Sequence, residues 1–490
     1  MDIEVNYRNK RRYKTARYPL HQTIFWTWLI WILSKIMLIG KKFKVEKVNM
    51  EGLKPPYMLL SNHMHFIDFE LAAMATWPYP VSNVVSIDGY VVKGFLLEWI
   101  GAIATRKFTT DIGLVKSIRH VLKRGDILAM YPEARYTPCG TTAYLPDSLG
   151  KLVKMNKVPV VAVVHHGNHL YAPFWDYKHK RKVPMHTVFT QILTAGEAAT
   201  LSVPEINTRI REALQYDEYR YQKEQGIKIT EPFRAQGLHR VLYKCPHCGE
   251  EFQMDSEGAE LFCKACGKRW LWQEDGYLKA LEGETEFDHI PDWFNWERKQ
   301  VSDEIDRGEY FYQTEVEVRS LPRTFRYIPI GKAILTHDPK EGFTLEGHYR
   351  GQRWFIHREC AQTNSLHVEY EFSPLQNKDL IDISTENDSF YCFIQSRAAS
   401  PSWLSPPRSC TCAARRSDVL KAVIARRSAQ VARQIHDRST NSRSPQSASP
   451  TAHLRAKSRL RRLRSETRLR AQPFSKGELW VRCVLSLDNR

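Results

Sequence analysis

The sequence predicts an α/β domain with an N-terminal membrane-associating helix, followed by a zinc ribbon, a small β-rich domain and a disordered C-terminal tail. Between residues 45 and 201, short apolar runs alternate with helix-like segments, as in α/β domains. Two Cys-x2-Cys pairs lie within residues 245–266. Between residues 287 and 393, apolar and polar side chains alternate with the period of a strand. These three observations define the predicted architecture.

The charge of the chain is concentrated at its C-terminal end. The 490 residues carry a formal net charge of +18, but residues 395–490 contain 18 Arg and 3 Lys against 5 acidic residues. The other 394 residues carry 51 basic and 49 acidic side chains, so the body is nearly neutral and no nucleic-acid partner is expected. Residues 395–490 fit two hypotheses, a disordered basic tail or a segment translated out of frame, and neither predicts a packed fold.

Residues 1–44 combine a basic segment with an apolar helix at 23–39. A helix of that length, at about 1.5 Å per residue, barely spans the roughly 30 Å hydrocarbon core, and Lys35 interrupts it. Its tryptophans and flanking cations favour a helix in the membrane plane or partly inserted. The alternatives are a buried core helix and an uncleaved signal sequence. We expect the protein at the cytoplasmic face of a membrane, peripheral or partly inserted.

Residues 45–240 form the predicted α/β domain. The predicted strands are 57–60, 81–87, 101–106, 127–131 and 158–164, and the predicted helices are 66–75, 94–100, 112–122, 148–155 and 204–222. Polar and charged residues recur where the apolar runs end. In open α/β sheets, functional sites are assembled at the carboxyl ends of the strands, so we expect these residues to meet there.

One stretch carries the chemistry, because His63 and Asp68 flank the junction between a predicted strand and a predicted helix. A carboxylate that accepts the proton of one imidazole nitrogen fixes the tautomer and leaves the other nitrogen free to deprotonate a hydroxyl. The sequence therefore predicts a base and its orienting carboxylate. The alternative is a helix cap beside an unrelated histidine, and His65, His165 and His166 are possible competitors for the role of base.

Four blocks in this order resemble the signature of the glycerolipid acyltransferases, and most closely that of the lysophosphatidic acid (1-acyl-sn-glycerol-3-phosphate) acyltransferases. They are His63-x4-Asp68, Gly101-x4-Arg106, Pro132-Glu133-Ala134-Arg135 and Val158-Pro159-Val-Val. The resemblance covers about residues 25 to 220. The family usually reads Glu-Gly-Thr-Arg in the third block, whereas this chain has Arg135 two residues after Glu133 and Tyr136 at the family's arginine position.

The resemblance implies roles for these residues. His63 would be the general base and Asp68 its partner. Gly101 and Arg106 would contact the phosphate of the acceptor, and Glu133 with Arg135 would form a second acceptor-binding block. The implied substrates are a lysophospholipid and an acyl thioester, either acyl-CoA or acyl carrier protein, and the implied product is phosphatidic acid for phospholipid synthesis. The alternatives from the residues alone are solvated strand-end charges for the arginines and a helix or turn cap for Glu133.

Residues 241–275 form the predicted zinc ribbon. Cys245, Cys248, Cys263 and Cys266 have the spacing of two knuckles that each give two thiolates to a tetrahedral zinc ion. Four thiolates leave no open position for a substrate, so we expect structural zinc. Residues 287–393 form the predicted β-rich domain, to which the sequence assigns no chemistry. A competing hypothesis from this region is a zinc-ribbon protein that binds nucleic acid and carries a non-catalytic α/β domain.

Overall fold

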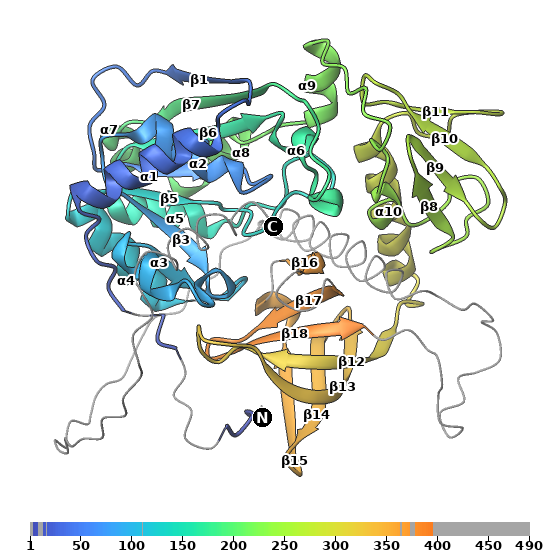
Figure 1. Cartoon of the computed structure of the whole chain (residues 1–490). Coiled ribbons are helices and arrows are strands. Elements are labelled where there is room, and N and C mark those ends of the chain that lie inside the picture. The colour runs from blue at the N-terminus through green and yellow to red at the C-terminus, as the bar shows by residue number, and fades with distance from the viewer. Residues whose placement is uncertain are drawn as a thin grey trace, which may run out of the picture. The chain divides into compact units, whose positions relative to one another are not determined.

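A computed structural model describes residues 3–7, 13–15, 17–109, 111–362, 365–372 and 378–394, all of which belong to one unit that spans residues 1–431. The predicted tail at 395–490 lies outside the described residues. Three sheets are present in the described part of the chain (Figure 1). The predicted mixed α/β architecture is therefore confirmed.

The first sheet has seven strands in the described residues. In spatial order they are β1 (Phe43–Val48), β7 (Met185–Leu193), β6 (Val160–His166), β2 (Met58–Ser61), β5 (Ile127–Met130), β3 (Val81–Ser86) and β4 (Ile103–Thr105). The five strands from β6 to β4 run parallel to one another, whereas β7 is antiparallel to β6. The carboxyl ends of β2, β4, β5 and β6 therefore lie at one edge of the sheet, where the predicted site residues follow.

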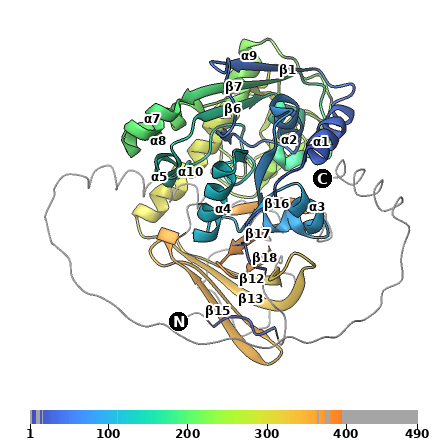
Figure 2. The same cartoon turned by 90° about the vertical axis from the view of Figure 1, so that its left-hand side faces the viewer.

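Helices cover both faces of this sheet. They are α1 (Ile24–Met37), α2 (Ile67–Thr76), α3 (Gly94–Trp99), α4 (Ile112–Lys123), α5 (Ser148–Asn156), α6 (Asn168–Tyr171), α7 (Ala195–Thr200), α8 (Val203–Ala213) and α9 (Glu218–Glu224). Alternate residues of a strand point to opposite faces, so Met58 and Leu60 pack with α4, α5 and α8, while Leu59 packs toward α2. Figure 2 shows α1 and α2 on one side of the sheet and α5 and α8 on the other.

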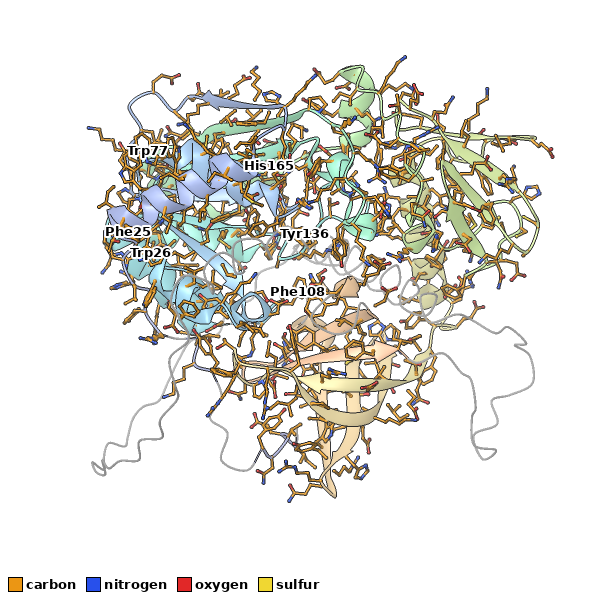
Figure 3. All side chains as sticks on the ribbon, in the orientation of Figure 1. Phe25, Trp26, Trp77, Phe108, Tyr136 and His165 are labelled. Atoms are coloured by element: carbon orange, nitrogen blue, oxygen red, sulfur yellow. The ribbon has the colours of Figure 1, made fainter. Side chains whose placement is uncertain are left out.

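Helix α1 presents its large apolar side chains outward. Small polar residues, Thr27 and Ser34, are buried on its inner face, and α1 packs against α2. The exposed apolar side chains of the helix are Ile24, Phe25, Trp28, Ile32 and Ile36, and Ile39 is exposed just after it. Figure 3 shows Phe25 and Trp26 at the start of this helix. Among the described residues, no helix has the length and apolar character needed to cross a membrane.

The second sheet carries the two Cys pairs and is antiparallel. Its strands are β8 (Met254–Glu257), β9 (Glu260–Cys263), β10 (Arg269–Trp272) and β11 (Leu278–Ala280). The cysteine pairs sit in tight turns that end at Gly249 and Gly267, each with a positive φ near 79°. The amide of each glycine donates to the carbonyl of the first cysteine of its pair, which closes the turn.

Residues 290–394 contain a helix that the sequence analysis does not predict, followed by the third sheet. Helix α10 (Ile290–Asp306) begins with proline in its first turn and buries Ile290, Trp293, Phe294 and Val301, which lie on one helical face. The strands, in spatial order, are β15 (Gln352–Arg358), β14 (Gly342–Tyr349), β13 (Ile328–Asp338), β12 (Tyr312–Ser320), β18 (Ser389–Ile394), β17 (Lys378–Ser384) and β16 (His367–Phe372). All neighbouring pairs are antiparallel.

The predicted helix at 204–222 is wrong, because the structure has α8 and α9 with a break between them. Asp217 at the break accepts hydrogen bonds from the amides of Tyr219 and Arg220, which starts a new helix. The remaining helical turns in the described residues are short 3₁₀ segments, at Ile87–Tyr90, Phe174–Asp176, Leu238–Arg240 and Cys360–Gln362.

The segment before α1 contacts the third sheet. Ile3 forms a β-bridge with Phe355, and the Tyr7 hydroxyl donates to Asp388 Oδ2 at 2.6 Å. Ser320 donates to the same carboxylate at 2.8 Å. Residues at the start of the chain therefore belong to the packing of the β-rich domain, although more than 300 residues separate them in sequence.

At position 101 only glycine permits the close approach of the Leu20 carbonyl to the backbone. The φ of Gly101 is +75°, and a Cβ there would lie 2.6 Å from the carbonyl oxygen of Leu20. We expect Gly101→Ala to destabilise the fold by more than about 2 kcal/mol, since the left-handed backbone penalty adds to a steric clash. Thermal unfolding measures the loss.

Gly52→Ala is the matched control for Gly101. Gly52 has a φ of +72°, and nothing lies within 4 Å of a Cβ built there. It should cost only about 1 kcal/mol, from the backbone conformation alone. Equal losses in the two variants would contradict a role for the contact with Leu20.

Candidate active site

His63 and Asp68 lie side by side at the carboxyl end of β2. The His63 Nδ1 atom is 3.0 Å from Asp68 Oδ2. The Asp68 side chain is fully buried, whereas the His63 side chain is 20% exposed. An ionised carboxylate at this distance places the imidazole proton on Nδ1, so Nε2 presents its lone pair. The described residues contribute no hydrogen bond to Nε2.

The local sequence builds a cage of donors around Asp68. Its Oδ2 accepts the amides of Met64 at 2.7 Å and His65 at 3.1 Å, because the chain turns back on itself where α2 begins. Its Oδ1 accepts a hydrogen bond from Asn168 Nδ2 at 2.7 Å. Burial alone would raise the pKa of Asp68, but the charges of His165 and His63 and these hydrogen bonds outweigh burial and lower that pKa to about 2. The carboxylate is therefore ionised at neutral pH.

Two asparagines fix the loop that carries the pair. Asn62 bonds to the backbone of His165 in both directions, with its Nδ2 donating at 3.1 Å and its Oδ1 accepting at 2.9 Å. Asn168 reaches Asp68 from the residue that starts α6, just after β6. Asn168 is not among the site residues that the sequence predicts. Its position just after an apolar strand is the signal that would have pointed to it.

His65 and His165 are unsuited to compete with His63 as the base. Burial lowers the pKa of both to about 4, so both are neutral and weakly basic near pH 7. The His65 Nδ1 atom accepts the amide of Ile67 at 3.2 Å, and the His165 Nδ1 atom lies 2.9 Å from the Thr187 hydroxyl. His166 lies 3.3 Å from Glu218 and stacks on Tyr221.

Two tyrosines hold the His63 ring. Tyr131, at the end of β5, stacks on it with ring centroids 3.8 Å apart, and Tyr136 lies at 4.2 Å. Tyr136, labelled in Figure 3, stands where the resembled family has its arginine. In this chain that position therefore supplies an aromatic contact to the histidine in place of a cation. The tyrosine at this position is visible in the sequence, whereas its contact with His63 is not.

The residues of the second block have separate surroundings. Gly101 precedes β4 and packs against the backbone of Leu20. Arg106 follows β4 and is 2% exposed. Its Nη1 donates to the carbonyl oxygen of Glu386 in the β-rich domain, at 3.3 Å. The acceptor roles that the resemblance implies for both residues stay predictions.

Glu133 is held inside the fold. Its Oε2 accepts the amide of Ala143 at 3.1 Å, and the Tyr216 hydroxyl donates to its Oε1 at 3.3 Å. Burial raises the pKa of Glu133 to about 8, so the carboxyl is mostly protonated at neutral pH. Ala134 follows with a φ of +53°, a left-handed conformation at the position where the resembled family has glycine.

Arg135 points to the β-rich domain. Its Nη1 donates to the carbonyl oxygen of Leu366, just before β16, at 3.5 Å. Burial lowers the pKa of this guanidinium from its ordinary value, but an arginine remains charged. The structure thus brings His63 and Asp68 into direct contact and places Arg106, Glu133 and Arg135 at the same edge of the sheet. Each of these three is engaged by other protein groups.

The four predicted zinc ligands come together. Their sulfur atoms lie within 4.8 Å of one another, with 3.8 Å between Cys245 and Cys266 and between Cys248 and Cys263. This cluster could hold a metal ion. Four thiolates in this arrangement fit a soft ion in tetrahedral geometry and leave no open coordination position.

Comparison with known proteins gives a structural likeness but no match in sequence. No protein-family model matches the chain, and no curated protein matches it. Among solved structures, it is similar to the 1-acyl-sn-glycerophosphate acyltransferase PlsC of Thermotoga maritima, with 12% sequence identity and a TM-score of 0.33. The match covers 39% of this chain and 77% of the Thermotoga chain. The function proposed below is therefore argued from the residues of this chain.

Proposed function

We propose that this protein is an O-acyltransferase in which His63 activates a hydroxyl group for attack on an acyl thioester. The contact between His63 Nδ1 and the buried Asp68 carboxylate carries the proposal. It supplies a base of fixed tautomer and fixed orientation, which is the geometry that general-base catalysis requires. The position of the pair, at the carboxyl edge of parallel strands, agrees with it.

The reaction is a direct transfer without a protein nucleophile. His63 Nε2 takes the proton of the acceptor hydroxyl as its oxygen attacks the thioester carbonyl. The tetrahedral intermediate collapses, the ester bond remains, the carbon–sulfur bond breaks, and the proton on His63 passes to the departing thiolate. A thioester is already activated, so a base, correct positioning and stabilisation of the oxyanion suffice.

The proposed acceptor is 1-acyl-glycerol 3-phosphate, and the proposed donor is acyl-CoA or acyl carrier protein. The product is then phosphatidic acid, an intermediate of phospholipid synthesis. Arg106 and Arg135 support this choice, because two guanidinium groups that follow β4 and β5 at the same edge of the sheet suit the oxygens of a phosphate monoester. The resemblance of the four blocks to lysophosphatidic acid acyltransferases supports it as well.

The cysteine cluster is proposed to hold one structural zinc ion. The ribbon supports the rest of the chain through buried contacts. Trp293 Nε1 of α10 donates to the carbonyl of Lys244 at 3.0 Å, and the Lys244 amide donates to Glu297 at 2.9 Å. Lys244 directly precedes Cys245, so a metal that orders this knuckle also orders the start of the helix that leads to the β-rich domain.

We also propose that α1 lies on the cytoplasmic face of a membrane, with its outer side chains among the lipids. The inversion of polarity on this helix supports the proposal, since its buried face carries Thr27 and Ser34 and its outer face carries isoleucine and aromatic residues. Trp99 of α3 extends the aromatic surface, with its ring 5.7 Å from Trp26 and half exposed. Trp26 and Trp99 suit a lipid interface.

Removal of the base should abolish transfer. We expect His63→Ala to lower the rate of acyl transfer to 1-acyl-glycerol 3-phosphate by about 10²-fold to 10⁴-fold, the range that a general base contributes. The measurement uses a radiolabelled acyl-CoA and the purified full chain. His120→Ala, an exposed histidine on α4, is the control and should retain full activity. Unchanged transfer by His63→Ala would exclude His63 as the base.

Loss of apolar side chains from α1 should release the protein from lipid. Ile32→Glu combined with Ile36→Glu should weaken binding to phosphatidylglycerol vesicles at least about tenfold, since burial of each isoleucine contributes about 1.5–3 kcal/mol. Co-sedimentation measures binding. Ile334→Glu, an exposed isoleucine of β13, is the matched control. If both proteins bind like the unmodified chain, α1 is not the lipid contact.

Metal content tests the cysteine cluster. The intact chain should carry one equivalent of zinc by elemental analysis, and Cys263→Ser should carry much less, because a hydroxyl is a poor ligand for this ion. A chelator should lower the unfolding temperature of the intact chain but not that of Cys263→Ser. Cys360→Ser, a buried cysteine outside the cluster, should keep its zinc. Equal zinc in all three proteins would rule the cluster out as the site.

A further inference from the structure

Three cations at the functional edge of the first sheet are in contact with the β-rich domain. Arg106 donates to the carbonyl of Glu386, and Arg135 to that of Leu366. Lys107, the residue after Arg106, reaches two side chains of the domain, with its Nζ 3.2 Å from Asp382 Oδ2 and 3.2 Å from His367 Nδ1. The β-rich domain therefore engages Arg106 and Lys107, which follow β4, and Arg135, which follows β5.

The ammonium group of Lys107 is surrounded by more carboxylates than it can neutralise. Its Nζ is 2.9 Å from Asp88 Oδ2 and 3.6 Å from Glu369 Oε1, in addition to Asp382. The Lys107 side chain is only 10% exposed. Burial would lower the pKa of Lys107, but the three carboxylates outweigh burial and hold that pKa above its ordinary value. One ammonium group is thus shared by three carboxylates, two of which come from β16 and β17.

Strand β16 also packs against the aromatic neighbours of the catalytic histidine. Tyr136, which lies against His63, is 5.5 Å from the ring of Phe174. Phe174 in turn lies 6.3 Å from His367 and 5.4 Å from Tyr370, both on β16. A continuous set of rings therefore joins the base to this strand. Displacement of β16 would alter the surroundings of His63 and of the cations together.

We propose that Lys107 is a further binding residue for the acceptor's phosphate, and that Glu369 and Asp382 compete with the phosphate for Lys107 until the edge strand β16, which carries Glu369, is displaced. The inference rests on the proposed acyl transfer to a phosphate-bearing acceptor. A phosphate monoester carries close to two negative charges, so it can compete with the two carboxylates for Lys107. Asp88 stays with Lys107 in both states, because it belongs to the α/β domain.

The position of β16 suits a strand that can be displaced. Among the described strands it is the last of its sheet and pairs only with β17, and the pairing is irregular between Glu369 and Phe372. Glu371, within that irregular stretch, has a φ of +48°, a strained conformation for a residue with a side chain. Edge strands with few ladder hydrogen bonds open at a lower free-energy cost than central strands.

The test compares carboxylate variants that keep the shape of the side chain. Glu369→Gln should lower the KM for 1-acyl-glycerol 3-phosphate about threefold to tenfold with little change in kcat, because a competing charge is removed from Lys107. Addition of Asp382→Asn should lower the KM further. Glu315→Gln, which removes an exposed carboxylate of β12 that pairs with Lys332, is the matched control and should leave the KM unchanged.

Lys107→Met completes the experiment. It should raise the KM, and Glu369→Gln should then no longer lower it, since the carboxylate acts through Lys107. An unchanged or higher KM in Glu369→Gln would overturn the proposal, as would an equal decrease in KM in the presence of Lys107→Met. The Glu369 side chain is 17% exposed, so we expect Glu369→Gln to fold. The single variant then remains informative even if its combination with Lys107→Met fails to fold.

A binding measurement separates this inference from the proposed reaction. Calorimetric titration of the full chain with glycerol 3-phosphate requires no acyl transfer. Suppose that Glu369→Gln binds glycerol 3-phosphate more tightly and that Lys107→Met removes this gain. The result would support competition between Glu369 and the phosphate for Lys107, even if no lysolipid were acylated. Active transfer without any effect of Glu369→Gln on KM or on this binding would leave the proposed function intact and exclude the role of β16 and β17.

Discussion

The buried carboxylate of Asp68 is the group on which the site depends. It accepts hydrogen bonds from two backbone amides, from His63 and from Asn168, and so joins the end of β2, the start of α2 and the end of β6. A buried charge persists only when it is compensated in this way. The requirement explains why the loop turns tightly at Met64 and why an asparagine follows β6. Loss of one donor would loosen both the fold and the orientation of the imidazole.

The same principle governs the cations at this edge. Arg106 and Lys107 are removed from water, which is costly unless carbonyl or carboxylate oxygens replace the lost hydration. The α/β domain supplies only Asp88 to Lys107 among the contacts described, and the β-rich domain supplies Asp382 and Glu369. The third sheet is therefore part of the electrostatic environment of the site. An isolated α/β domain would present these cations to solvent.

The sequence predicts those features that local spacing encodes. Strands alternating with helices fix the parallel sheet, the five-residue separation of His63 and Asp68 fixes their contact, and the Cys-x2-Cys pairs fix the sulfur cluster. Contacts between distant segments leave no such pattern. Arg106 and Glu386 are 280 residues apart, and the sequence near either residue does not predict the hydrogen bond between them. Helix α10 is not predicted, because most of residues 287–393 show the alternation of strands and the helical pattern is confined to residues 290–306.

Tyr136 shows why motif residues have to be interpreted together with their surroundings. The resembled family has a cation at this position, whereas Tyr136 packs on His63 and, through Phe174, against β16. Tyr136 therefore gives His63 an aromatic neighbour that also contacts the β-rich domain through Phe174. Arg135, one residue earlier, turns to the carbonyl of Leu366 in the same domain. Both departures from the motif therefore have the same structural consequence, since each ties the third block to residues 366–372.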